Sequence, residues 1–141
     1  MPLICPSGIF SPPGAEMTQA GYEHTPDSLA AVVRAAAAEC KLPIYVTENG
    51  LAGDDDTRRI AFVDRALAGL HQCIADGIDV RGYWYWSILD NFEWVFGYAV
   101  HFGLVAVDRS TQARHPKPSA YHYGAIARSN TLPAGAQAGR L

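Results

Sequence analysis

The chain has 141 residues, 49% of them hydrophobic and 18% charged, with a formal net charge of −3 at pH 7. This length supports one domain with a hydrophobic core, and the slightly acidic balance argues against nucleic acid or an anionic membrane as a partner. No apolar run reaches the roughly 18 residues of a transmembrane helix, and the first residues lack the basic start and apolar stretch of a signal peptide.

The first part of the chain predicts a loop, a helix and a strand. Residues 1–24 are rich in Pro, Gly and Ser without a period, which indicates a long leading loop. A helix is predicted to start with Thr25 as its cap and Pro26 at its first position, and apolar residues then recur at helical intervals up to Cys40. The run 44–47 is rich in β-branched and aromatic residues and predicts a short buried strand.

The second part predicts another helix and another strand. The acidic run 54–56 fits a helix start with Asp56 near the cap, and its consecutive spacing does not match a calcium loop, in which the ligands alternate. Apolar residues then form one helical stripe that stops near Gly77. The remaining elements are predicted at 80–86 (strand), 102–107 (short extended piece), 118–128 (helix) and 129–141 (flexible tail).

The order helix, strand, helix, strand, helix indicates an α/β protein. Two strands separated by an amphipathic helix over roughly 30 residues form a βαβ unit with parallel strands. In such folds the functional residues lie at the carboxyl ends of the strands. Glu48 stands at the first of these ends and the segment 86–94 follows the second, so we expect both at one rim of the protein.

The segment 83–94 holds all three tryptophans of the chain, together with tyrosines, a phenylalanine, acids and an amide. Flat aromatic faces beside oriented carboxylates suit a ligand with apolar ring faces and hydroxyl groups around its rim, which describes a sugar. The alternative is a core strand followed by an aromatic-rich turn, because large aromatic side chains usually serve packing. The position of Glu48 at the same rim favours the sugar site.

No cofactor and no metal site are predicted. The five histidines show no helical metal spacing, and no phosphate-binding or hydrolase-elbow motif occurs. The cysteines Cys5, Cys40 and Cys73 are odd in number and far apart, which favours free thiols in a reducing compartment, so we expect a cytoplasmic protein. Cys40 and Cys73 fall at apolar helix positions, where cysteine packs as a small hydrophobic residue.

Several short motifs follow one another along the chain. They are Tyr45-Val46-Thr47-Glu48-Asn49-Gly50, Trp86-Ser87-Ile88-Leu89-Asp90-Asn91-Phe92-Glu93-Trp94, Gly97-Tyr98, Phe102-Gly103-Leu104, Val107-Asp108 and Pro116-Lys117-Pro118-Ser119-Ala120-Tyr121. Each is modest alone, whereas their order and spacing together are specific. Over residues 20–128 the chain resembles the C-terminal third of glycoside hydrolase family 1, the β-glucosidase family.

The resemblance implies a (β/α)8 barrel, of which the predicted strands would be the seventh and eighth, in a partial domain over 25–128. It also implies hydrolysis of β-glycosides with retention of configuration. Glu48 matches the family's catalytic nucleophile. Trp86 matches the tryptophan that forms a platform under the sugar, Glu93 the carboxylate that binds its hydroxyl groups, and Trp94 a further sugar contact.

Three nearby residues carry no such role. Trp84 and Tyr85 lie where the family varies, so we expect both to serve packing. His101 stands where the family commonly has Arg or Lys, and we attach no catalytic meaning to it.

A retaining glycosidase needs a second carboxyl group, about 5–5.5 Å from the first, to protonate the leaving oxygen. In the family this acid lies in an Asn-Glu-Pro motif, which the chain lacks. A complete (β/α)8 barrel takes about 250 residues. We therefore expect a partial barrel and an isolated chain without hydrolytic activity, from a truncated or split gene.

Three functions stay open at this point. The chain is a nucleophile-bearing part of a retaining β-glycosidase acting on a β-glucoside or related small saccharide, a sugar-binding module without catalysis, or a structural remnant. Two strands alone would expose sheet edges and the apolar inner face of the barrel. Such a surface favours self-association or a complementing chain that carries the other strands.

Overall fold

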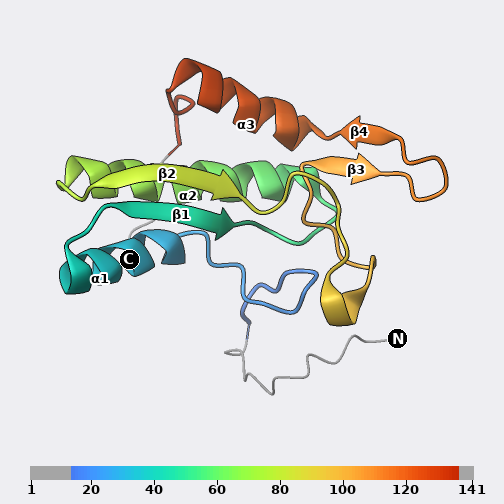
Figure 1. Ribbon diagram of the computed structural model, residues 1–141, viewed down its shortest axis with the longest axis horizontal. Coiled ribbons are helices and arrows are strands. Elements are labelled where there is room, and N and C mark those ends of the chain that lie inside the picture. Colours follow the sequence, from blue (N-terminus) through green and yellow to red (C-terminus); the bar gives the residue numbers. More distant parts are fainter. Residues whose placement is uncertain (1–13, 137–141) are drawn as a thin grey trace.

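The computed structural model describes residues 14–136, so residues 1–13, with Cys5, and the predicted tail beyond residue 136 lie outside the described range. The elements are α1 (Ser28–Cys40), β1 (Ile44–Asn49), α2 (Asp56–Ala75), β2 (Val80–Tyr85), the 3-10 turn η1 (Trp94–Phe96), β3 (Val105–Val107), β4 (Arg114–Pro116) and α3 (Pro118–Ser129) (Figure 1). None of these helices is long and apolar enough to cross a membrane.

Strands β1 and β2 pair in parallel and α2 connects them, which confirms the predicted βαβ unit. Strands β3 and β4 form an antiparallel pair, of which sequence analysis had anticipated only one extended piece over 102–107. In the described part of the predicted leading loop, from residue 14 on, Met17 and Glu23 form an isolated antiparallel bridge. Helix α3 runs one residue past its predicted end, to Ser129.

The start of α1 differs from the predicted one, whereas the start of α2 agrees with it. The backbone N–H of Ser28 donates to the carbonyl of Thr25 at 3.1 Å, so residues 25–28 form a turn and α1 begins only at Ser28. In α2 the cap is Asp55, whose carboxylate accepts from the backbone N–H of Thr57 at 2.9 Å. Asp56 is the first residue of the helix, next to this cap, which confirms the helix start predicted at the acidic run 54–56.

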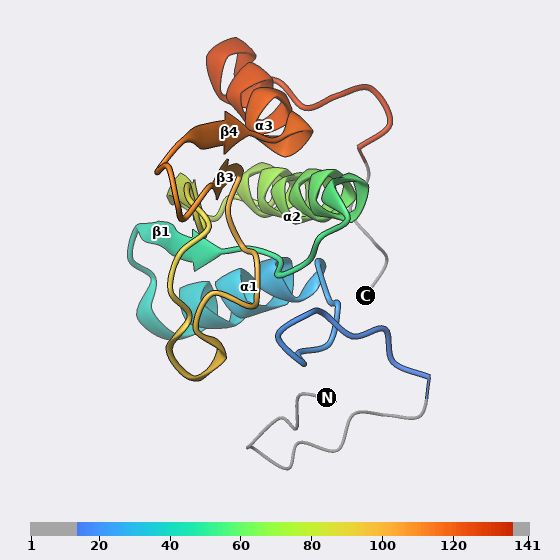
Figure 2. The ribbon, with the colours of Figure 1, turned by 90° about the vertical axis from the view of Figure 1, so that its right-hand side faces the viewer.

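The helices α1 and α2 cover one face of the β1–β2 sheet (Figure 2). Val46 of β1 is buried there with Val33 of α1 and with Leu70 and Cys73 of α2. The packing predicted for Cys73 is confirmed, whereas that predicted for Cys40 is wrong, because Cys40 is exposed in the last turn of α1. The main core therefore lies between the sheet and its helices.

The opposite face of the sheet is open in the described part of the chain. Tyr45 and Trp84 are each 52% exposed there, and their ring centroids lie 6.2 Å apart. The packing predicted for Tyr85 is confirmed, since its ring is buried on the helical side, whereas the Trp84 ring lies over Gly82 and beside Tyr45 and stays half exposed. Within residues 14–136 each of these two strands pairs with the other alone, so this part of the chain closes no barrel.

The buried guanidinium of Arg59 links several loops and helix starts through hydrogen bonds. It is fully buried and donates to the carboxylate of Asp56 and to the backbone carbonyls of Gly53 and His101. The same carboxylate accepts the backbone N–H and the hydroxyl of Ser119, both at 2.7 Å. Thus α2, the start of α3 and two loops share one polar cluster.

Asp56 is the acid of this cluster. Burial alone would raise the pKa of Asp56, but the hydrogen bonds from Ser119 and Arg59 outweigh it and lower the pKa below the ordinary value of 3.8. Because the folded pKa lies below the unfolded one, the charged carboxylate stabilises the fold above about pH 4. This contribution disappears as the pH falls through the lowered folded value.

We expect Asp56→Asn to lower the free energy of unfolding by about 3 kcal/mol at pH 7, because it leaves the buried guanidinium without its counter-charge. Urea unfolding at pH 7 and at pH 3 measures this. The difference from the wild-type chain should shrink at pH 3. Asp79→Asn, which removes an exposed ion pair to Arg81, is the matched control and should change little. Equal effects of the two substitutions would contradict the role of the cluster.

The two parallel strands meet most closely just after their carboxyl ends. A Cβ atom on Gly50 would lie 1.7 Å from the carbonyl oxygen of Trp86, so only glycine fits. The backbone N–H of Trp86 also donates to the carbonyl of Asn49 at 2.9 Å. The chain leaving β1 is thereby pressed against the chain leaving β2.

Gly50→Ala should separate these chain ends and cost about 1–3 kcal/mol of stability, as overpacking does elsewhere. Near-ultraviolet circular dichroism should also change, because Trp86 must move. Gly53→Ala is the control, since a Cβ atom there meets nothing within 4 Å. If both variants keep the wild-type spectrum and urea midpoint, the close approach is not a constraint.

Candidate functional site

Glu48 occupies a bulge near the end of β1. Val46 pairs with Tyr83 and Asn49 pairs with Tyr85, so three steps along β1 match two steps along β2. The extra residue disturbs the alternation of faces. Val46 is buried on the helical side, whereas Thr47 and Glu48 are both exposed. The bulge thus gives the Glu48 carboxylate access to the side away from the helices.

Two tyrosines of β2 hold the residues that follow Glu48 through hydrogen bonds. The hydroxyl of Tyr83 donates to the side-chain oxygen of Asn49 at 3.0 Å. The hydroxyl of Tyr85 accepts from the backbone N–H of Leu51 at 3.2 Å and donates to the carbonyl of Phe102 at 3.2 Å. Burial raises the pKa of both tyrosines, so these hydroxyls keep their protons.

Trp86 and Glu93 meet directly. The indole Nε1 of Trp86 donates to Oε1 of Glu93 at 3.1 Å, and the side-chain nitrogen of Asn91 donates to the same oxygen at 2.6 Å. Trp86 is 38% exposed and Glu93 is half-buried, so a broad indole face and a carboxylate stand side by side with access to solvent.

Trp94 follows Glu93 at the tip of a closed loop. The backbone N–H of Glu93 donates to the carbonyl of Gly97 at 2.7 Å, and Phe96 N–H donates to the carbonyl of Glu93 at 2.8 Å. At the base of the loop, the guanidinium of Arg109 lies 3.7 Å above the ring of Tyr98. Trp94 itself is 84% exposed, with a φ of 45°. Its indole projects from the loop without packing against the described chain.

The structure therefore groups the four residues singled out from the sequence at one end of the sheet. Glu48 and Trp86 lie at the ends of neighbouring strands, Glu93 is bonded to Trp86, and Trp94 is next in the chain. Sequence reasoning did not single out Asn91, which donates to Glu93, or Tyr83, which donates to Asn49 next to Glu48. Asn91 could have been found, because it lies inside the longest motif, two residues before Glu93. Nothing in the sequence indicates that Tyr83 pairs with Asn49.

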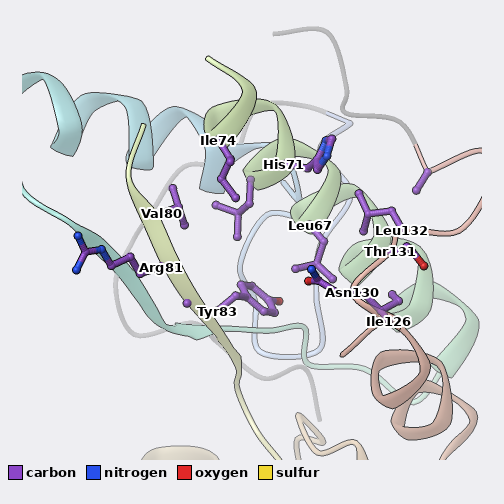
Figure 3. A pocket seen from close by; sticks show the side chains of 13 residues that line it. Leu67, His71, Ile74, Val80, Arg81, Tyr83, Ile126, Asn130, Thr131 and Leu132 are labelled. Atoms are coloured by element: carbon purple, nitrogen blue, oxygen red, sulfur yellow. The ribbon is translucent and has the colours of Figure 1, made fainter. Parts of the chain in front are cut away.

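A cavity of about 710 Å³ lies elsewhere, between α2, β2 and α3 (Figure 3). Its walls are mainly aliphatic, with Leu67, Ile74, Val80 and Ile126 among them. It adjoins the first half of β2, whereas Glu48 and Trp86 stand at the opposite ends of the strands. The cavity is therefore separate from the candidate site. Within residues 14–136, no cluster of three or more metal-ligating side chains occurs.

The chain matches a known protein family and several of its members. The family model described as glycosyl hydrolase family 1 matches residues 11–132. A β-galactosidase of Sulfolobus acidocaldarius is 40% identical over 113 residues, which are 80% of this chain and 23% of that protein. β-Glucosidase A of Thermotoga maritima is 37% identical over 125 residues, covering 82% and 28% of the two chains.

Solved structures agree with the sequence matches. The apo structure of β-glucosidase 1317 has a TM-score of 0.84 and 52% identity, over 91% of this chain and 31% of that one. The β-glucosidase from Thermotoga maritima in complex with glucoimidazole has a TM-score of 0.83 and 35% identity, over 88% and 30%. The chain thus spans about a quarter to a third of the length of these relatives. It belongs to glycosyl hydrolase family 1, as an α/β part of the family's (β/α)8 barrel.

Proposed function

We propose that this chain supplies the nucleophile and one sugar-binding wall of a retaining β-glycosidase that acts on β-glucosides or related small saccharides. The observation that carries the proposal is the hydrogen bond between Trp86 and Glu93, placed beside the end of the strand that bears Glu48. A family 1 β-glucosidase has been solved with glucoimidazole, which supports a sugar-shaped site in this family.

Each residue has a chemical role in this proposal. The indole of Trp86 stacks on the apolar face of the sugar ring, and Glu93 accepts hydrogen bonds from its hydroxyl groups. Trp94, the most exposed of the three tryptophans, adds a second contact from the loop tip. These contacts hold the anomeric carbon near Glu48, and such positioning accounts for much of the rate of an enzyme.

The reaction is a double displacement. The carboxylate of Glu48 attacks the anomeric carbon while the leaving oxygen takes a proton from a second carboxyl group, which gives a covalent glycosyl intermediate. Water then attacks that carbon, transfers its proton to the same second group and releases Glu48. The chain has no Asn-Glu-Pro motif to supply this group. A polypeptide with the other six βα units would supply it and would cover Tyr45 and Trp84 on the open face.

The proposal is tested by mixing the chain with a polypeptide carrying the first six βα units of a family 1 β-glucosidase. The complex should hydrolyse an aryl β-glucoside, and Glu48→Gln should lower turnover by at least about a thousandfold. Glu39→Gln, at an exposed position of α1, is the matched control. Mass spectrometry should find one glycosyl unit on the peptide that contains Glu48. Turnover that survives Glu48→Gln would refute the role of this residue.

A second candidate is a sugar-binding module without catalysis, favoured by the exposure of Trp86 and Trp94. It predicts that glucose changes the tryptophan fluorescence of the isolated chain, and that Trp86→Phe removes most of the change. A titration that stays flat to high millimolar glucose would exclude this candidate. Sugar binding together with hydrolysis by the complex would favour the glycosidase.

A further inference from the structure

We propose that Asn91 is a positioning residue that orients the carboxylate of Glu93, so that one oxygen is held by the protein and the other faces the sugar. This inference rests on the proposed role of Glu93 in sugar binding. It assigns a task to a residue that itself need not touch the sugar.

The carboxylate is held through one oxygen. Trp86 Nε1 and Asn91 Nδ2 both donate to Oε1 of Glu93, at 3.1 and 2.6 Å. No donor within residues 14–136 lies at hydrogen-bond distance from Oε2. A charge-assisted hydrogen bond as short as that of Asn91 is among the stronger ones in proteins. Asn91 therefore fixes the rotation of the carboxylate, and Oε2 is free to accept hydrogen bonds from a ligand.

The amide of Asn91 has one orientation only. A carboxylate accepts hydrogen bonds and cannot donate them, so the nitrogen of Asn91 must face Glu93. Its second N–H points to the carbonyl of Phe92 at 3.3 Å, and its oxygen lies 3.0 Å from the hydroxyl of Ser87. The single proton of that hydroxyl also faces the carbonyl of Leu89, at 2.7 Å, so the orientation of the amide is set by its nitrogen. Turning the amide over would place its oxygen against the carboxylate, two acceptors facing each other.

The backbone under Asn91 is anchored firmly. The side chain of the neighbouring Asp90 accepts from Gly103 N–H at 2.8 Å and from Nζ of Lys117 at 3.0 Å. The backbone of Asp90 is bonded on both sides, by its N–H to Val105 and by its carbonyl to Arg109, at 2.9 and 2.7 Å. Asn91 therefore follows directly after Asp90, a buried residue held by several hydrogen bonds, and does not lie at the exposed tip of the loop.

Packing alone does not hold the Asn91 side chain. Asn91 borders a cavity of about 280 Å³, together with Tyr98, Arg109 and Lys117. Since there is open space beside it, its position depends on its hydrogen bonds more than on its shape. A substitution that keeps the shape but removes the donor therefore separates the two roles.

Asn91→Asp is that substitution, because aspartate has the same shape but presents a second charge to Glu93. In the isolated chain, Asn91→Asp and Asn91→Ala should both move the indole N–H resonance of Trp86 in a proton–nitrogen NMR spectrum, since the shared carboxylate turns. Gln72→Glu is the control, because Gln72 donates to Asp76 on the surface of α2 at 2.9 Å, far from Trp86. An indole resonance that stays in place in both Asn91 variants would overturn the proposal.

The assembled glycosidase provides the second measurement. Asn91→Ala should raise KM for an aryl β-glucoside about tenfold or more, as expected for losing a hydrogen bond to a charged group. In a Glu93→Gln background the same substitution should cost less than about twofold, because its target has changed. Equal losses in both backgrounds would show that Asn91 does not act through Glu93. If the assembly has no activity, the proposed function fails and the NMR result on the isolated chain still decides the role of Asn91.

Discussion

The burial of one positive charge organises the loops of this chain. A guanidinium removed from water is costly unless acceptors surround it. Arg59 takes its acceptors from three separate places: Asp56 on its own helix, Gly53 after β1, and His101 after the aromatic loop. Because all three must point at the same group, the segments that follow Glu48 and the loop that bears Glu93 are held in a fixed relation. The spacing of the candidate site follows from this constraint.

The two faces of the sheet have different tasks. The helical face holds the main core, with Val46, Leu70 and Cys73 packed together. The other face carries Glu48 and the exposed rings of Tyr45 and Trp84. In the proposed function, stability and chemistry are therefore divided between opposite sides of the same two strands. Such a division lets a segment keep its own core on the helical face, while the opposite face of its sheet stays open to contacts from other parts of a barrel.

Two kinds of sequence information predicted much of the fold and of the candidate site. They are the spacing of apolar residues and the tendency of functional residues in α/β folds to lie at the carboxyl ends of strands. The stripe of apolar residues in α2 predicts a helix, and the β-branched run in β1 predicts a strand. The sequence alone was therefore enough to place Glu48 at the carboxyl end of a strand. The start of α1 was predicted wrongly, because the favourable cap at Thr25 competes with a turn that ends at Ser28. The exposure of Trp84 depends on what covers its face of the sheet, which the periodicity of β2 does not reveal, and the hydrogen bond from Asn91 to Glu93 depends on a loop path that no local propensity specifies.

The bulge in β1 has a consequence for how this sequence can vary. Since three residues span the distance that two span on β2, the place where Glu48 emerges depends on how many residues separate it from Val46. Replacing Thr47 by another residue leaves that number unchanged, whereas deleting it would remove the bulge and draw the Glu48 carboxylate back along the strand, away from Trp86. Insertions and deletions near residue 47 are thus far more restricted than substitutions. For the carboxylate of Glu48, the length of the strand matters more than the identity of its neighbours.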